Sequence, residues 1–325
     1  YILLIVVAGL SSGSCVDRET EVPMQLFLQR LFDGLTLGAI YAVVAVALVL
    51  IFKATTLINF AQGELAMFGA FIAYVLAVEQ GLNIVLAIFL AMLVSAAMGA
   101  AIERVLIRPF DPTDHLPVVL ITLGVFLILN AVAGEIWNYQ PRAFPSLFPK
   151  GADDYVSIGG ARLFYDAIGT WAMLGAMMFV LYLILNKTKI GLSFRAVSSN
   201  TDSARLVGIR TGRTLMFGWA LACAFGTLGA TLVAPRLFLQ PNMMATLLIF
   251  SFASAALGGL DSLPGAVIGG ISIGLIQSLL VGYLGDWGPL EFLRNLSLAV
   301  AFVVILIVLS FRPSGLFGTS RVERV

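Results

Sequence analysis

The chain has 325 residues, of which 60% are hydrophobic and 11% are charged, and its formal net charge is +1. Soluble domains carry about 25% charged residues, so this composition excludes a soluble core of this size. The near-neutral charge gives no support for nucleic-acid binding, and the two cysteines and one histidine indicate neither a disulfide framework nor a His-rich metal site.

The chain opens with an apolar segment, Tyr1–Leu10, which is followed by small residues up to Cys15. Such a segment fits either a truncated signal sequence or the end of an extra membrane helix, and the pattern leaves both readings open. We therefore divide the chain into two parts. Residues 1–23 form a signal-like or extra membrane segment with an external lead-in, and residues 24–325 form a single transmembrane domain.

Nine later stretches contain no Asp, Glu, Lys, Arg or His. Most of them approach or exceed the roughly 20 apolar residues that a helix needs to cross the hydrocarbon core of a bilayer. The sequence thus predicts an all-α, polytopic transmembrane helix bundle of about nine spans. The stretches are Gly34–Phe52, Leu65–Val78, Gln80–Ile102, Leu116–Gly134, Ala167–Asn186, Thr214–Pro235, Leu237–Leu260, Ser262–Gly285 and Asn295–Phe311.

Two joints in this series look like breaks at membrane depth. The short second stretch is preceded by Asn59–Glu64, and the seventh and eighth are joined by Gly258–Gly265. Irregular backbone is tolerated inside a membrane only where protein or a wet cavity surrounds it, so we expect discontinuous helices here. Both joints place a small residue, an acid and a glycine near the start of a helix, which suggests an internal repeat of the kind found in transporters.

The basic residues give the orientation. With Lys187–Arg213 in the cytosol, 12 of the 19 basic residues and 7 of the 18 acidic residues lie on the cytosolic side. This bias agrees with the positive-inside rule. The carboxy terminus is then cytosolic, and the loop Asn138–Asp166 is external.

Polar residues in or beside the spans are candidates for a translocation path or a gate. Glu64 and Asp261 lie in amino-terminal turns, where a carboxylate caps a helix or, alternatively, serves as a gate or a contact to a partner subunit. The uncharged candidates could hydrogen-bond a small polar solute or a neighbouring helix. They are Asn59, Gln62, Thr122, Asn130 and Gln277.

The sequence holds no phosphate-binding loop and no nucleophile elbow. We predict no catalytic residue, no cofactor and no metal ligand, so the chain is not expected to be an enzyme. If transport uses ATP, the ATPase must be another polypeptide.

The cationic segment Lys187–Arg213 contains a short amphipathic helix. Asn200 or Thr201 can cap it, and roughly nine helical residues reach only ~13 Å, too short to cross a membrane. We expect Ala204 and Gly208 to form a small-residue stripe for close packing by another protein; the alternative is a helix that lies on lipid head groups. The candidate residues for this contact, to which the family resemblance given next assigns an ATPase-coupling role, are Thr201, Asp202, Ala204, Arg205, Leu206, Gly208 and Ile209.

Six blocks of sequence occur in a characteristic order: Gly34–Tyr41, Ile58–Glu64, Ile102–Pro109, Arg195–Ile209, Leu257–Gly270 and Arg312–Gly318. Through these blocks, from Phe32 to Val325, the chain resembles the LivH-type permeases of branched-chain amino acid ATP-binding cassette importers. Those permeases belong to a wider group that includes urea and amide importers. Members of the family often have His where this chain has Gln62.

The resemblance implies a multi-pass permease domain in a bacterial-type cytoplasmic (inner) membrane, with its coupling loop at residues 187–213. Its protein partners would be a second, LivM-like permease, two cassette ATPase subunits and an extracytoplasmic solute-binding protein. The chain itself would contact the lipid bilayer, and no nucleic acid would be involved. Branched-chain amino acids are the first choice of solute, and urea or short amides are the alternative. An ion-coupled secondary transporter or channel is a further alternative, but it would want charged residues within the spans.

Overall fold

The computed structural model describes residues 17–110, 115–281, 297–312 and 314–318. The segment Tyr1–Leu10 and Cys15, read above as signal-like, lie outside the described residues. The lead-in that follows them is helical, because α2 (Asp17–Thr55) begins seven residues before position 24 and runs on without a break.

The described chain is almost entirely helical. After α2 come α3 (Gln62–Tyr74) with its π-helical extension η1 (Val75–Glu79), α4 (Ile84–Ile102) with η2 (Glu103–Ile107), α5 (His115–Trp137), the strands β1 (Tyr155–Ile158) and β2 (Ala161–Phe164), α6 (Tyr165–Lys187), α7 (Lys189–Ser199), α8 (Thr201–Leu206), α9 (Thr211–Leu237), α10 (Met243–Gly258), α11 (Leu263–Leu275) with η3 (Ile276–Val281), and α14 (Ser297–Phe311).

Seven helices of the described part are long and apolar enough to cross a membrane. The expected all-α, polytopic bundle is confirmed, but a count of about nine spans is not. The two uncharged stretches that fall short lie on α10 and α14, which have 16 and 15 described residues. A helix of 16 residues is about 24 Å long, less than the roughly 30 Å of a hydrocarbon core.

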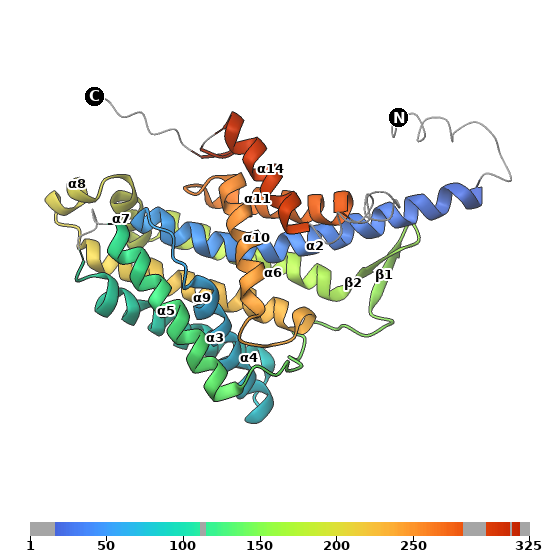
Figure 1. The fold of residues 1–325 in the computed structure, drawn as a ribbon, viewed down its shortest axis with the longest axis horizontal. Helices are drawn as coiled ribbons and strands as arrows, with labels where there is room; N and C mark the ends of the chain where they lie inside the picture. Colours follow the sequence, from blue (N-terminus) through green and yellow to red (C-terminus); the bar gives the residue numbers. More distant parts are fainter. Residues whose placement is uncertain (1–16, 111–114, 282–296, 313, 319–325) are drawn as a thin grey trace.

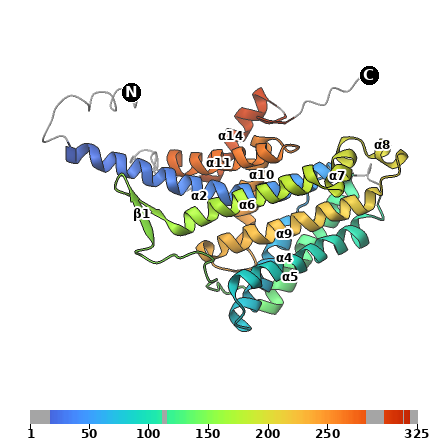
Figure 2. The ribbon, with the colours of Figure 1, turned by 180° about the vertical axis from the view of Figure 1, so that it is seen from behind.

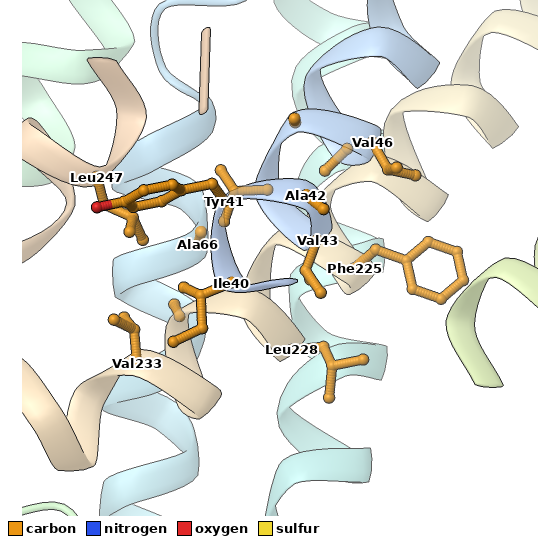
Figure 3. Close-up of a cluster of buried hydrophobic side chains, with 14 of the residues drawn as sticks. Ile40, Tyr41, Ala42, Val43, Val46, Ala66, Phe225, Leu228, Val233 and Leu247 are labelled. Atoms are coloured by element: carbon orange, nitrogen blue, oxygen red, sulfur yellow. The ribbon is translucent and has the colours of Figure 1, made fainter. Parts of the chain in front are cut away.

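Helix α2 is the centre of the bundle. Figure 3 shows its side chains Ile40, Val43 and Val46 among residues contributed by α3, α9 and α10, including Ala66 and Leu228. These side chains are buried, as a helix enclosed by other helices requires. Figure 2 shows α6 and α9 running alongside α2.

Glycines bring α2 and α11 together as an antiparallel pair. A Cβ atom on Gly38 would lie 2.6 Å from the Cα of Ile271, and one on Gly274 would lie 2.2 Å from the backbone nitrogen of Gly38. One turn further along, a Cβ on Gly270 would meet Ala42 at 2.7 Å. Small residues four apart on both helices thus let the two backbones touch.

The first joint is buried, as the sequence indicates. α3 begins at Gln62, whose Nε2 donates a hydrogen bond of 2.9 Å to the carbonyl oxygen of Ala222. Ala222 lies about 17 Å along α9 from its first residue, Thr211. Gln62 is fully buried there, so α3 starts inside the bundle rather than at its surface.

The second joint is a tight hairpin between α10 and α11. A Cβ on Gly258 would lie 1.9 Å from the carbonyl oxygen of Gly265, so the two helices contact each other through their backbones. The chain after α14 covers this joint, because the amide groups of Leu316 and Phe317 donate to Leu257 and Gly258 at 2.9 and 3.0 Å.

The bundle has two distinct ends, seen at left and right in Figure 1. At one end α7 and α8 lie with the α10–α11 joint, and Lys53 donates to the backbone oxygen of Asp261 at 3.3 Å. At the other end lie the β1–β2 hairpin and the ion pair between Arg236 and Asp166, 2.7 Å long. The loop at residues 187–213 and Asp261, which the sequence assigns to one side of the membrane, therefore lie at one end of the molecule, whereas Glu64, assigned to the same side, lies inside the bundle.

Candidate functional site

The first candidate site is the α7–α8 knob, residues 189–209, which protrudes at one end of the bundle. The hydroxyl oxygen of Thr188 caps α7 by accepting from the amide of Gly191 at 3.1 Å. Phe194 and Val197 of α7 are buried. The ring of Phe194 packs against α9, where a Cβ on Gly218 would approach it to 2.9 Å. The knob is therefore fixed to the bundle through an aromatic anchor.

The tip of the knob is α8, which has six residues rather than the nine expected. Asn200 is its cap, since its Oδ1 accepts from the amide of Ser203 at 2.9 Å. The helix ends in a pair of hydrogen bonds, from Gly208 to the carbonyl of Arg205 and from Ile209 to that of Ala204, both 3.0 Å. This is the Schellman arrangement, and it places the glycine in the left-handed region with φ of +82°.

The exposed surface of α8 differs from the expected one. Ala204 is only 3% exposed, so the expectation of an exposed stripe of Ala204 and Gly208 is wrong. Both small residues have local roles, one packing inward and the other ending the helix. What α8 presents instead is an apolar pair, Leu206 at 89% and Val207 at 76% exposure. Sequence reasoning missed Val207, although an apolar residue beside a helix-ending glycine was a usable signal.

Polar residues surround this apolar pair. Asp202 and Arg205 are exposed and 3.9 Å apart, and Thr201 and Ile209 are half-buried. An apolar tip with charged neighbours on a short, capped helix is a surface that another protein can bind.

Gly208 gives a test of this geometry. A Cβ there would meet nothing within 4 Å, so only the backbone conformation penalises a side chain. We expect Gly208→Asn to keep the knob, because Asn tolerates the left-handed region, whereas Gly208→Val should destabilise α8 by about 1–2 kcal/mol. Limited proteolysis of the loop at residues 199–213 measures this difference, and equal cleavage of the two variants would contradict it.

The second candidate site is the Asn130 cluster, formed by Glu64, Asn130, Tyr139, Asn242 and the carbonyl of Pro241. The Nδ2 atom of Asn130 lies 3.4 Å from Oε2 of Glu64, 3.4 Å from the Pro241 oxygen and 3.1 Å from Oδ1 of Asn242. The hydroxyl of Tyr139 donates to Oδ1 of Asn130 at 3.2 Å. α3, α5 and the turn before α10 thus meet at a single amide.

Burial differs sharply across the Asn130 cluster. Glu64 is 1% exposed, Asn130 is half-buried, and Tyr139 and Asn242 are exposed. Glu64 lies in the first turn of α3, but its hydrogen bond goes to Asn130 rather than to an amide of its own helix. The arrangement is a buried carboxyl group that is separated from an exposed face by one side chain.

The other candidate residues do not join this cluster. Asn59 and Gln62 bond each other at 3.4 Å within the buried joint, and Thr122 bonds the carbonyl of Val119 in its own helix at 2.9 Å. Gln277 accepts from the hydroxyl of Tyr41. Gln62 and Gln277 thus bond neighbouring helices, as the helix-packing alternative describes, whereas the bonds of Asn59 and Thr122 are local. Asp261 lies at the knob end, and the neighbouring Ser262, not Asp261, caps α11.

Sequence reasoning missed Tyr139 and Asn242. Tyr139 lies in a predicted external loop, and Asn242 lies near the start of the uncharged stretch Leu237–Leu260 without a distinguishing pattern; only the fold brings them to Asn130. Within the described residues, no three His, Cys, Asp or Glu side chains are placed to hold a metal ion.

A cavity of about 320 Å³ lies at the opposite end from the knob. Charged side chains of both signs line it, because Asp33 and Lys150 face it together with the paired Asp166 and Arg236. Its position between α2, α6 and the β-hairpin leaves it accessible to a partner approaching from that side.

Comparisons with known proteins cover almost the whole chain. Residues 30–309 match the family described as branched-chain amino acid transport system, permease component. The chain is 29% identical over 312 residues to the high-affinity branched-chain amino acid transport system permease protein BraD of Pseudomonas aeruginosa, covering 92% of this chain and 98% of that protein. It is 28% identical over 319 residues to the corresponding protein LivH of Escherichia coli K12, with the same shares of the two chains.

A more distant relative and a solved structure extend the comparison. The probable branched-chain amino acid transport permease protein LivH of Methanocaldococcus jannaschii is 29% identical over 282 residues, covering 84% of this chain and 87% of that one. The structure of PsaBC from Streptococcus pneumoniae in complex with Fab is similar over 86% of this chain and 90% of that one, with 14% identity and a TM-score of 0.45.

Proposed function

The chain belongs to the family of branched-chain amino acid transport permease components, and from this membership we propose that it is the membrane-spanning permease subunit of an ATP-binding cassette importer for branched-chain amino acids. The observation that carries the proposal is the family match, which runs over residues 30–309 and so covers all or most of each of the seven candidate spans found in the described residues. The helical, polytopic fold supports the same reading.

The energy source lies in other subunits. No phosphate-binding loop occurs in the sequence, so two separate cassette ATPase subunits would hydrolyse ATP. We place the ATPase contact at the knob, with Leu206 and Val207 inserted into a groove of the ATPase and Asp202 and Arg205 at the rim. Ala204, which the sequence placed among the coupling residues, is left out of this contact because it faces the chain's own interior.

The knob is suited to pass movement to the bundle. Phe194 packs on α9, and the guanidinium group of Arg108 joins the side chain of Glu103, at 2.6 Å, to the carbonyl of Gly212, at 2.8 Å, near the start of α9. When ATP closes the cassettes, α8 would be displaced, and α9 would move with it. The bundle would then rock between outward-open and inward-open states.

The solute path would run along the exposed side of α5 and α10, opposite a second, LivM-like permease. Asn242, directly before α10, and Thr246, one turn later on α10, are exposed, and Asn130 of α5 bonds Asn242. Exposed polar groups at span depth are costly against lipid, which favours a partner subunit on this face.

We retain Glu64 and Asn130 as path residues and assign Asn59, Gln62, Thr122 and Gln277 to helix packing. For Asp261 we keep a role at the knob-end joint.

The orientation in the inner membrane is part of the proposal. We place the knob and the carboxy terminus in the cytosol, and the hairpin end with its cavity outside, where a solute-binding protein would dock. Cysteine labelling tests this placement. Lys189→Cys, at an exposed position of the knob outside the ATPase contact, should react with a membrane-impermeant maleimide in inverted vesicles only, and Lys150→Cys in spheroplasts only. The reverse pattern would overturn the orientation.

The function itself is tested by reconstitution. The chain should co-purify with a second permease and two cassette ATPases, and proteoliposomes holding the complex should accumulate leucine only with ATP and the solute-binding protein present. A complex whose ATPase carries a disabling substitution in its own phosphate-binding loop is the control. Accumulation by this control would mean that an ion gradient drives transport.

A further inference from the structure

We propose that the Asn130 cluster is a receptor for a primary ammonium group of the solute, and that the side-chain amide of Asn130 occupies the ammonium position in this structure. The inference rests on the proposed function and deepens it, since it assigns a chemical requirement to the transported solute. It concerns Glu64, the Pro241 carbonyl and Asn242.

The side-chain amide of Asn130 is surrounded by more hydrogen-bond acceptors than it has hydrogens. Three oxygen atoms, from Glu64, Pro241 and Asn242, converge on the Nδ2 atom of Asn130 at 3.4, 3.4 and 3.1 Å. An amide nitrogen carries two hydrogens, whereas an ammonium group carries three. The oxygen set therefore offers one acceptor more than its present occupant can satisfy. The distances to Glu64 and Pro241 exceed the usual range for such bonds, and the distance to Asn242 is near its upper end.

The carboxyl group of Glu64 has no cationic side chain paired with it in the described residues. One of the three oxygens belongs to a carboxyl group that is 1% exposed, and no Lys or Arg of the described chain forms an ion pair with it. Ionisable side chains in membrane segments are rare, are usually paired, and mark functional sites. A carboxylate, a main-chain carbonyl and an amide oxygen together match a compact cation with three donors better than they match a neutral amide.

Only the side chain of Asn130 separates the three oxygens from the exposed face in the described structure. Asn130 is the only side chain bonded to Glu64 among the described residues, and its own neighbours Tyr139 and Asn242 are exposed. α5, which carries Asn130, packs chiefly on α3 and η2, so it has few contacts to break when it shifts. A small movement of α5 would withdraw the amide and open the three oxygens to the exposed face on which we place the solute path.

The alternative of a purely structural carboxyl group fits the contacts less well. In a capping role the carboxyl group of Glu64 would accept a hydrogen bond from a backbone amide of α3, but it accepts from the side-chain amide of Asn130 instead. A helix-packing role would need no third acceptor on Asn130. The ammonium reading accounts for both features. It also separates amino acids, which carry an ammonium group, from urea and simple amides, which do not.

The test is site-specific protection in the complete importer, reconstituted without nucleotide. Thr246→Cys places a thiol on the exposed face of α10, one turn beyond Asn242. We expect 3-methylbutan-1-amine to slow its labelling by a maleimide about 10-fold or more, as a charge-assisted hydrogen bond allows. Its anionic counterpart, 3-methylbutanoate, should have no effect. Background labelling is measured in the parent chain without Thr246→Cys.

Variants of Glu64 test whether its carboxyl group binds the ammonium group. Glu64→Gln should abolish protection by the amine and lower leucine uptake about 10- to 100-fold, whereas Glu64→Asp should keep part of both. Glu79→Gln is the matched control, because Glu79 lies at the far end of the same span, is exposed and pairs with Arg142 at 3.7 Å. It should leave protection unchanged.

Several results would overturn the inference: equal protection by the acid, protection by sodium ions but not by the amine, no protection in the Thr246→Cys complex that keeps Glu64, or undiminished protection when Glu64→Gln is added to it. If Glu64→Gln does not assemble with its partners, Glu64→Asp decides, since loss of amine protection in an assembled Glu64→Asp complex also counts against the receptor. Absence of ATP-driven uptake by the parent complex would instead contradict the proposed function, because the protection assay needs no ATP.

Discussion

Replacing Leu206 and Val207 together by glutamate is expected to abolish ATP-driven uptake while leaving the membrane bundle folded. The two side chains are 89% and 76% exposed, so they contribute little to the stability of this chain. In a docking groove they would be buried, and central apolar anchors of interfaces contribute about 2 kcal/mol or more each. Two buried glutamates would add the cost of desolvating two charges.

The measured quantities are co-purification with the ATPase subunits and leucine uptake in proteoliposomes. Loss of either by roughly 30-fold or more corresponds to about 2 kcal/mol and supports the docking assignment. Ser203→Glu is the matched control, because it adds a charge to an exposed polar position of the same short helix. Normal uptake by the double variant would remove α8 from the coupling mechanism.

Local chemistry made part of the knob predictable. Asn200 could be identified as a cap because capping depends on residues within three positions along the chain. The spacing of Ala204 and Gly208 was misinterpreted, since four residues separate both a helix stripe and the positions of a Schellman ending. Which of the two applies depends on the side that faces the bundle, and burial of Ala204 is a tertiary property.

The hydrophobicity of whole segments made the bundle predictable, but it did not predict where each helix begins and ends. The seventh uncharged stretch, Leu237–Leu260, begins well before α10. Phe238 adopts a positive φ of +61° and Leu239 pairs with Arg142 in a β-bridge, so the first residues of this stretch form a turn. Charge content alone does not distinguish an apolar turn from a span.

The Asn130 cluster shows what a single sequence does not provide. Glu64 and Asn130 were each identifiable as polar residues near apolar stretches, but their contact joins positions 66 apart, and the contact of Asn130 with Asn242 joins positions 112 apart. Pairings of this range depend on how α3, α5 and α10 pack. Packing in membranes is set by the shapes of small residues more than by hydrophobic pattern.

The glycines between α2 and α11 are expected to be the most sensitive positions for folding. A Cβ on Gly34 would lie 3.0 Å from its nearest neighbour, one on Gly38 2.6 Å and one on Gly274 2.2 Å, and at the last two positions that neighbour is a backbone atom. Backbone cannot rotate away as a side chain can, so overpacking here should cost at least the usual 1–3 kcal/mol.

The expected order of destabilisation by alanine is therefore Gly274, then Gly38, then Gly34. Gly175→Ala on α6 is the control, because a Cβ there meets nothing within 4 Å; it should be neutral or stabilise by about 0.5–1 kcal/mol, as alanine does in a helix. Thermal unfolding of the purified complex in detergent measures the series. If Gly38→Ala unfolds at the same temperature as Gly175→Ala, α2 and α11 are not in backbone contact. The central helix would then be free to shift against α11 during transport. A large loss at Gly38 and Gly274 instead means that α2 and α11 move as one unit, and that the rocking motion driven from the knob must occur at other helix contacts, such as those of α5.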